Sequence, residues 1–304
     1  MINNIKVIDK ILNLSLTQLR IVEAVARQRH LTRAALELHL TQPALSMQVR
    51  QASGIAGELL FAPRGRGLVP TDAGLRVAQA AREIMTILDG LKADLADRRG
   101  LKTGVLRLAA ATTAEYFAPE LLGRFHDRHP GIDIRLEVLN RALVLERFRS
   151  GADDLFIMAR PPQDGDIVSH RFLENPLVAV SAVDHPLARR ARVALREFTA
   201  EPFINREPGS GTRLILDEFL ARKGVEVRSR MTLGSNEAIK QAVMAGFGCA
   251  VISRLALGDS VRIAQLPVAG FPLRSFWHVV HARAARLTPA ARAFVDFVRE
   301  APTA

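Results

Sequence analysis

The sequence of 304 residues contains a single cysteine, Cys249, so it cannot form a disulfide bond within the chain. One cysteine is typical of proteins that work in a reducing compartment, and we therefore expect a cytoplasmic location. Cys249 lies in the apolar run GFGCAVIS. A thiol in such a run is more often a small buried core residue than a redox sensor, which needs an exposed and activated thiolate.

Long apolar runs are also absent, and we expect no signal peptide. No run of about eighteen apolar residues occurs, so we expect no segment that spans a membrane. The N-terminal sequence MINNIKVIDKILNLS lacks the long apolar core and the small-residue cleavage site of a signal peptide. Acidic residues are scarce, with 31 Asp and Glu against 42 Lys and Arg. The formal net charge of +11 favours a polyanionic partner, either nucleic acid or an anionic membrane.

The motifs of common enzymes are missing. The loop Pro208-Gly-Ser-Gly-Thr212 has neither the lysine nor the spacing of a Walker A loop, and its spacing also differs from a nucleophile elbow. The histidines do not form a His-Glu-x-x-His motif. His126 and His129 lie three residues apart, where a surface or capping role is a simpler interpretation than a metal site. We therefore predict a protein that is not an enzyme, with no catalytic residue, no metal site and no cofactor.

Three short helices are predicted near the N-terminus. Ser15-Leu-Thr-Gln18 forms a capping box that begins the first helix. Thr32 is the expected N-cap of the second helix, and Thr41 that of the third, with Pro43 in its first turn. The tight link between the second and third helices gives helix-turn-helix spacing.

Polar side chains on the third helix and on the turn that follows it can reach DNA. Amides and hydroxyls can bind base edges in the major groove, and hydroxyls and arginines can bind phosphates. The candidates on the third helix are Thr41, Gln42, Ser46, Gln48 and Arg50. The basic turn PRGRG can form a wing whose arginines, Arg64 and Arg66, approach the DNA backbone or the minor groove. A small helical bundle that binds protein is the alternative.

The segment LTQLRIVEAVARQRHLTRAALELHLTQPALSMQVRQ resembles the winged helix-turn-helix of LysR-type transcriptional regulators. The ordered match of AVA, LTRAA and L-TQPA-S carries the resemblance. It implies promoter DNA as a partner, with Thr32, Gln42, Pro43, Ser46 and the wing arginines at the DNA. The sequence departs from the family at Ala52-Ser53-Gly54, at Pro63 and at Pro70. Since glycine is a weak helix former, we expect Gly54 to loosen the end of the third helix.

A long helix without proline is predicted from Asp72 to about Arg99. Its apolar residues alternate spacings of four and three, which is typical of a coiled-coil seam; they are Val77, Ala81, Ile84, Leu88, Leu91 and Leu95. A two-helix dimer is favoured over a core face within one chain, because helix-turn-helix proteins read paired half-sites. The expected domains are therefore 14–71 for DNA binding, 72–99 for dimerisation and 104–300 for the remainder.

The C-terminal part alternates short apolar runs with amphipathic helices, which predicts an α/β domain. Strands are expected at 105–111, 132–139, 154–159, 177–182, 228–233, 248–253 and 275–281, and helices at 116–128, 141–150, 194–200, 211–223, 236–245 and 289–299. Ligands of such sheets bind at the turns that follow strands. Three of these turns are rich in small polar groups: 111–113, 206–212 and 234–236. A helix N-cap is the simpler interpretation of each turn alone, but together they predict an anion-binding cleft.

The C-terminal part also resembles LysR-type regulators, and within them the CbbR-type regulators of RuBisCO (Calvin-cycle) operons. The matching segments are AATTAEYFAPELL, FRSGADDLFIMARPP, EPFINREPGSGTR and LGSNEAIKQAV. The resemblance implies a two-lobed, periplasmic-binding-protein-like effector domain, with lobe I at about 104–172 and 268–300 and lobe II at about 173–267. It also implies activation of carbon-fixation genes, an anionic or phosphorylated co-effector, and a tetramer built as a dimer of dimers. RNA polymerase is a further expected partner.

The resemblance also implies the residues of the effector cleft. They are Thr112, Thr113, Pro161, Gly209, Ser210, Gly211, Thr212 and Asn236. Arg206 and Arg213 are candidate charge partners for the anion. Two alternatives remain open at this point: a LysR-type regulator of another pathway with a different effector, and a DNA-binding protein with no effector.

Overall fold

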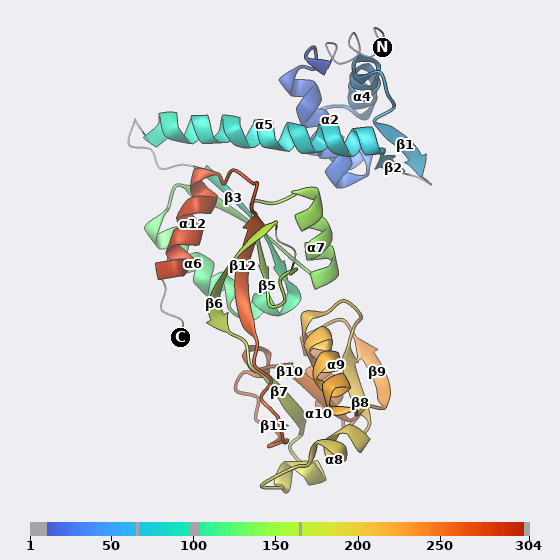
Figure 1. The fold of residues 1–304 in the computed structure, drawn as a ribbon, viewed down its shortest axis with the longest axis vertical. Coiled ribbons are helices and arrows are strands. Elements are labelled where there is room, and N and C mark those ends of the chain that lie inside the picture. Colours follow the sequence, from blue (N-terminus) through green and yellow to red (C-terminus); the bar gives the residue numbers. More distant parts are fainter. Residues whose placement is uncertain (1–10, 65–66, 98–103, 164–165, 301–304) are drawn as a thin grey trace. The chain divides into compact units, whose positions relative to one another are not determined.

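The computed structural model describes residues 11–64, 67–97, 104–163 and 166–300. The chain divides into two compact units (Figure 1). The first contains Met1–Leu101 with two short pieces, Arg149–Ala152 and Ala285–Thr288, and the second contains the rest of the chain.

The first unit has the order of helices and hairpin that the sequence predicts. It contains α2 Leu16–Gln28, α3 Leu31–Glu37, α4 Gln42–Ala56, β1 Phe61–Arg64, β2 Gly67–Pro70 and α5 Asp72–Asp97. One apolar core joins these elements and includes the fully buried side chains of Val22, Leu45 and Leu60. The antiparallel pair β1 and β2 forms the predicted wing. Gly65 and Arg66, which lie between these strands in the sequence, are outside the described residues.

The helix caps follow the sequence with one correction. The capping box is confirmed, because the Gln18 N–H donates to Ser15 Oγ at 3.2 Å and the Ser15 N–H donates to Gln18 Oε1 at 3.0 Å. Thr41 caps α4 as predicted. The prediction that Thr32 caps the second helix is wrong: α3 begins at Leu31, with His30 as its N-cap residue. Leu31 packs against the core, so tertiary packing sets the start of this helix.

The long helix α5 divides into a buried and an exposed part. Ala78 and Ala81 are fully buried, and α5 packs against α2. Further along, four apolar side chains are 37–53 % exposed: Ile87, Leu88, Leu91 and Leu95. The predicted helix is confirmed, and the second half of its apolar seam faces outward in the single chain.

The second unit contains two five-stranded sheets, and we name the part around each sheet a lobe. The sheet of lobe I has the order β4-β3-β5-β12-β6, from β3 Gly104–Ala111, β4 Ile132–Leu139, β5 Leu155–Met158, β6 Ile167–Glu174 and β12 Phe276–Ala282. The sheet of lobe II has the order β11-β7-β10-β8-β9, from β7 Leu177–Ala182, β8 Phe203–Arg206, β9 Ser229–Leu233, β10 Cys249–Ser253 and β11 Ile263–Gln265. The α/β class is thereby confirmed.

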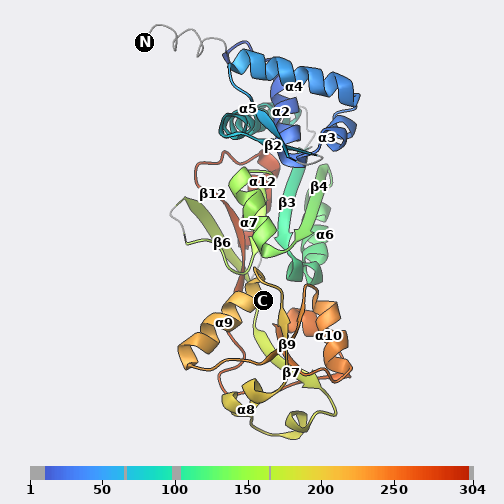
Figure 2. The same ribbon diagram turned by 90° about the vertical axis from the view of Figure 1, so that its right-hand side faces the viewer.

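Helices cover both faces of each sheet (Figures 1 and 2). Lobe I contains the 3-10 helix η1 Thr112–Tyr116, α6 Ala118–Arg128, α7 Arg141–Ser150 and α12 Pro289–Glu300. Lobe II contains η2 Pro186–Arg189, α8 Leu195–Ala200, α9 Gly211–Lys223, α10 Asn236–Met244 and α11 Arg254–Leu257. In lobe II, α9 and α10 pack on separate apolar clusters. Cys249 belongs to the first of these clusters and is fully buried, which confirms its interpretation as a core residue. Burial raises the pKa of its thiol to about 12.

Three strands escaped prediction: β6, β8 and β11. β6 has the sequence IVSHRFLE, whose mixture of polar and apolar residues hides its period, and β11 is only three residues long. β8 is the sequence FINR, which ends directly at the polar turn 206–212. Its Asn205 and Arg206 are 1 % and 4 % exposed. Because strand prediction expects apolar residues at buried positions, these two polar residues hid the strand.

Two glycines of the first unit allow a matched test of its packing. A Cβ atom on Gly74, in the first turn of α5, would lie 1.9 Å from the main-chain oxygen of Leu60. A Cβ on Gly54, inside α4, would meet no atom within 4 Å. We expect Gly74→Ala to destabilise the unit by about 1–3 kcal/mol or more, because the backbone must move. Gly54→Ala should stabilise it by up to about 1 kcal/mol, because alanine has a higher helix propensity than glycine.

Urea denaturation of the full chain and of both variants, followed by circular dichroism, measures this difference. Equal midpoints for the two variants would contradict the close approach of α5 to Leu60.

Candidate functional site

The polar turn between β8 and α9 lies at the carboxyl end of β8 in the lobe II sheet. Ser210 caps α9, and its Oγ accepts from the Arg213 N–H at 3.5 Å. Gly209 has a φ of +83°, a left-handed conformation that favours glycine. Ser210 and Thr212 are 3 % and 6 % exposed. The N-terminal N–H groups of α9 and the positive end of its dipole therefore lie in a partly enclosed space.

Arg206, the last residue of β8, is a buried cation with several partners. Its Nε donates to Glu207 at 2.8 Å, and a second nitrogen donates to the same carboxylate at 3.1 Å. Its third nitrogen donates to Asn236 Oδ1 at 2.7 Å and to Thr113 Oγ1 at 3.5 Å. Burial of a charge is costly unless it is paired and hydrogen-bonded, and these bonds meet that requirement.

One of these partners, Thr113, belongs to lobe I, so the network joins the two lobes. Asn236 at the start of α10 also donates to Thr113 Oγ1 at 3.0 Å. Glu207 accepts a hydrogen bond from Asn140, which directly precedes α7. The loops that follow the neighbouring strands β3 and β4 thus meet the loops that follow the neighbouring strands β8 and β9 of the other sheet.

A second link lies beside this network. The hydroxyl of Tyr116 donates to Glu237 at 2.7 Å, and Lys240 forms an ion pair with Glu237 at 2.7 Å. The hydrogen bonds from Lys240 and Tyr116 lower the pKa of Glu237. Burial, and then the hydrogen bond to Glu237, raise the pKa of Tyr116 far above its ordinary value. The phenol is therefore the donor in this bond at neutral pH.

A small pocket lies between the lobes and is lined by residues of both. The lining residues are Ala111, Thr112, Thr113, Arg141, Ala159, Asn175, Arg206, Ser210, Gly211, Thr212 and Trp277. Its volume of about 20 Å³ holds roughly one water molecule. An organic anion therefore needs the lobes to separate or the lining side chains to shift.

The structure brings most of the predicted cleft residues to this pocket. Six of them line it: Thr112, Thr113, Arg206, Ser210, Gly211 and Thr212. Asn236 adjoins it through its bonds to Arg206 and Thr113, and a Cβ on Gly209 would lie 3.0 Å from that of Ala142. Pro161 does not line the pocket; it lies two residues beyond Ala159, which does. The other candidate cation, Arg213, pairs with Asp217 along its own helix at 2.7 Å.

Sequence reasoning missed Arg141, Asn175 and Trp277. Arg141 follows Asn140 in a further βα turn, after β4, so the rule that ligands bind at such turns could have found it. Asn175 directly follows β6, a strand that the sequence did not predict, and Trp277 lies in β12. No local pattern marks either residue as part of a site.

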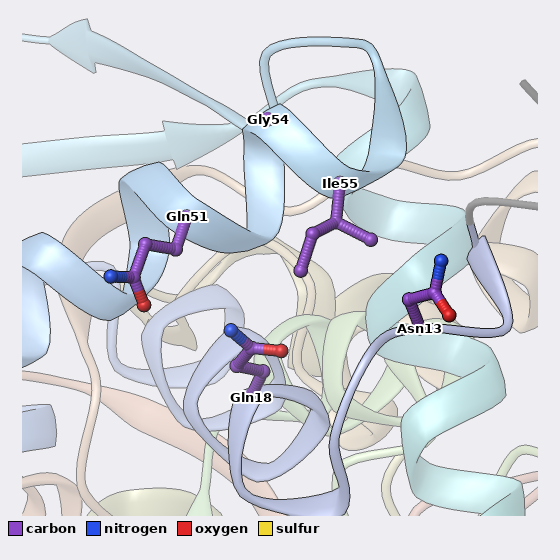
Figure 3. A pocket seen from close by; sticks show the side chains of 5 residues that line it. All are labelled: Asn13, Gln18, Gln51, Gly54 and Ile55. Atoms are coloured by element: carbon purple, nitrogen blue, oxygen red, sulfur yellow. The ribbon is translucent and has the colours of Figure 1, made fainter.

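A larger hollow, of about 440 Å³, lies on the first unit (Figure 3). Asn13, Gln18, Gln51, Gly54 and Ile55 line it. The hollow is open to solvent, and none of these side chains is charged. The smaller pocket between the lobes has arginines and a helix N-terminus, and is therefore the better candidate for an anion.

The candidate DNA-binding residues lie on the surface of the first unit. Thr32, Gln42, Pro43, Arg50 and Arg64 are exposed, and Ser46 is half-buried. Gln42, Ser46 and Arg50 follow one another at a spacing of four residues, so they lie on one side of α4, beside the face that carries its buried residues. The hydroxyl of Thr41 accepts from the Ala44 N–H at 3.4 Å as the helix cap.

The remaining two candidates stand apart from this face. Gln48 follows Ser46 by two residues, a rotation of about 200° around the helix, which places it on another side of α4. Arg66 lies outside the described residues. The face of α4 that can enter a groove is therefore smaller than the sequence suggests.

The described ranges contain neither a candidate membrane span nor a candidate metal site. No helix in them combines the length and apolar character that a bilayer span requires. Nor do they contain a group of three or more His, Cys, Asp or Glu residues that could hold a metal ion.

Comparison with known proteins links the two units to one family. Residues 16–75 match the model described as "Bacterial regulatory helix-turn-helix protein, lysR family", and residues 99–303 match the "LysR substrate binding domain". A RuBisCO operon transcriptional regulator of Allochromatium vinosum is 42 % identical over 94 % of this chain and 96 % of its own. The HTH-type transcriptional activator CmpR of Synechocystis is 40 % identical over 94 % of this chain and 95 % of its own.

A solved structure shares the second unit. The CcmR regulatory domain of Synechocystis, in complex with 2-PG, is 40 % identical and has a TM-score of 0.62. The match covers 64 % of this chain and 96 % of that domain.

The network between the lobes predicts different costs for two substitutions. Asn236→Ala removes an acceptor from a buried guanidinium and should lower the free energy of unfolding by about 1–3 kcal/mol. Tyr116→Phe removes a hydroxyl from a more exposed bond and should cost less than about 1 kcal/mol. Thermal unfolding of the two variants measures both. A larger loss from Tyr116→Phe than from Asn236→Ala would contradict the ranking by burial.

Proposed function

The chain belongs to the LysR family of bacterial transcriptional regulators, and we propose that it controls genes of carbon dioxide fixation in response to an anionic metabolite. The proposed target genes are supported by two relatives, a RuBisCO operon transcriptional regulator and the activator CmpR. They are 42 % and 40 % identical over 94 % of the chain. The observation that supports the anion is the pocket between the lobes, with its arginines and the N-terminus of α9.

The first unit binds promoter DNA in this proposal. The N-terminal part of α4 enters the major groove, where Gln42 and Ser46 contact base edges. Thr32, Arg50 and Arg64 contact phosphates, which position the protein without specifying the sequence. The exposed seam of α5, from Ile87 to Leu95, pairs with a second copy, since such a stripe is buried when two helices associate. Two dimers then form a tetramer.

The second unit binds the effector, and the protein acts as an activator. 2-phosphoglycolate is the model ligand, because the related CcmR domain was solved in complex with 2-PG. A ligand that binds one arrangement of the lobes more tightly than another shifts the population toward it. That shift alters how the dimerised DNA-binding units engage their sites and recruit RNA polymerase. The process takes place in the cytoplasm and needs no chemical reaction on the ligand.

Ligand-induced stabilisation tests the effector. We expect 2-phosphoglycolate, at about 100 times its Kd, to raise the thermal midpoint of the full chain by on the order of 5 °C. Shikimate, a carboxylate without a phosphoryl group, serves as the control and should give a smaller shift. If the midpoint does not move with any phosphorylated or carboxylated metabolite of central carbon metabolism, the anionic effector is wrong.

Variants of α4 test the DNA-reading face. Gln42→Ala combined with Ser46→Ala should abolish the preference for promoter DNA over random DNA while leaving the thermal midpoint within about 1 °C, since both side chains are surface groups. Gln51→Ala, on the same helix but at the hollow of Figure 3, is the matched control and should keep the preference. Footprints of the double variant that equal those of the parent would reject these residues as readers.

A further inference from the structure

We infer that two exposed contacts between the lobes, Tyr116 with Glu237 and Arg160 with Glu218, act as clasps that control access to the pocket. Each clasp joins a side chain of lobe I to a carboxylate of lobe II. The inference rests on the proposed function for the ligand that enters the pocket, whereas the clasps themselves can be tested without a ligand. The opening of the clasps then sets the rate at which an effector reaches its site.

The first clasp joins η1 of lobe I to α10 of lobe II. The Tyr116 hydroxyl donates to Glu237 Oε1 at 2.7 Å, and Lys240 Nζ lies 5.7 Å from the centre of the tyrosine ring. Lys240 also pairs with Glu237 at 2.7 Å, so the ring and the two charged groups contact one another. A cation over an aromatic face is attracted to the ring, and Lys240 therefore adds a second attraction between the lobes.

Both sides of this clasp are fixed to the cores of their lobes. Phe117, which follows Tyr116, is buried, and its ring packs against Trp277 at a centroid distance of 5.0 Å. On the other side, Ile239 and Val243 of α10 are fully buried in lobe II. The backbones that carry the clasp therefore move with their lobes, and separation of the lobes breaks the clasp.

The second clasp is an ion pair on the other side of the lobe II sheet. Arg160, two residues after β5 of lobe I, donates to Glu218 of α9 at 2.6 Å. α9 and α10 cover opposite faces of the sheet, because the adjacent residues Phe203 and Ile204 of β8 belong to the two separate clusters on which these helices pack. The lobes are thus held at two places, one on each side of that sheet.

The clasps lie beside the pocket and are not part of its wall. Among the described residues, the wall includes Thr113, Ala159 and Thr212, which are close in sequence to the clasps, but none of the four clasp side chains. A ligand can therefore occupy the pocket without contact to a clasp. Because the pocket has a volume of only about 20 Å³, a ligand that enters by separation of the lobes must first break both clasps.

Exposure makes the clasps weak enough to open. The side chains of Glu237, Arg160 and Glu218 are 55 %, 37 % and 48 % exposed. Contacts between exposed charged groups contribute little, because water and salt screen them. Asn236 and Thr113 also join α10 to η1, at 3.0 Å, but they are buried. Water reaches the clasps before it reaches this inner bond, so opening begins at the clasps.

Stopped-flow binding of 2-phosphoglycolate to the full chain tests the control of access. Trp277 is the only tryptophan and lines the pocket, so its fluorescence reports the ligand. Tyr116→Phe breaks the first clasp without a change of charge. It should raise the association rate constant by about 2- to 5-fold, the effect of one exposed hydrogen bond on the fraction of open molecules. Glu226→Gln, which removes a charge from lobe II outside both clasps, is the control and should bind at the rate of the parent.

A spectroscopic measurement tests the clasps without a ligand. Tyr116 is the only tyrosine, so the full chain labelled with 3-fluorotyrosine gives a single fluorine resonance. We expect this resonance to show exchange on the timescale of domain motion, microseconds to milliseconds. It should move in Glu237→Gln, which breaks the clasp of Tyr116 directly. Glu218→Gln, which breaks the other clasp, should move it in the same direction, because both variants favour the open lobes, whereas Glu226→Gln should leave it in place.

The outcomes separate the clasps from the function that they serve. If the resonance in Glu218→Gln stays where it is in Glu226→Gln, the two contacts are independent surface pairs and the inference is wrong. If the resonance responds as expected but the parent does not bind 2-phosphoglycolate, the proposed effector fails and the clasps stand. If the ligand binds and Tyr116→Phe associates at the rate of the parent, the ligand enters without separation of the lobes, which overturns the control of access. Should Glu218→Gln fail to fold, Arg160→Gln breaks the same clasp and takes its place.

Discussion

A buried charge must be paired and hydrogen-bonded, and the turns that form the cleft of the second unit supply the partners of one such charge. The guanidinium of Arg206 is 4 % exposed and lies at the end of a strand that otherwise supplies core residues. Its partners are Glu207 from its own loop and two residues from other turns, Asn236 at the start of α10 and Thr113 in lobe I. Since an unpaired buried charge costs several kcal/mol, the turns are held together wherever Arg206 is buried. The approach of the two lobes is thus tied to one hydrogen-bonded network.

That constraint explains how a pocket with almost no free volume can act as a sensor. The space between the lobes holds about one water molecule while the network is intact. An anion must change the distance between the lobes or the positions of the lining side chains in order to enter. Its binding energy is then available to favour a different arrangement of the lobes. The N-termini of α7 and α9, with Arg141, supply the positive potential that makes the change favourable for an anion.

Much of this fold follows from local sequence rules. The capping box at Ser15, the cap at Thr41, the long helix after Asp72 and most strands of the second unit rest on short-range patterns, and the structure confirms them. These rules fail where contacts between residues far apart in the sequence determine the structure. Leu31 starts α3 early because it packs on the core. β8 ends in the buried Arg206, because Asn236 of α10 and Thr113 of lobe I accept its hydrogen bonds. Trp277 joins the site only through strand order and the approach of the lobes, since no local pattern marks it.

The central claim is that an anion bound between the lobes changes how the protein engages DNA. A footprint of the parent protein on the DNA upstream of carbon-fixation genes, with and without saturating 2-phosphoglycolate, measures this most directly. We expect the ligand to change the length of the protected region or the protein concentration needed for protection. An identical footprint at an identical protein concentration, while calorimetry shows the ligand bound, would contradict it.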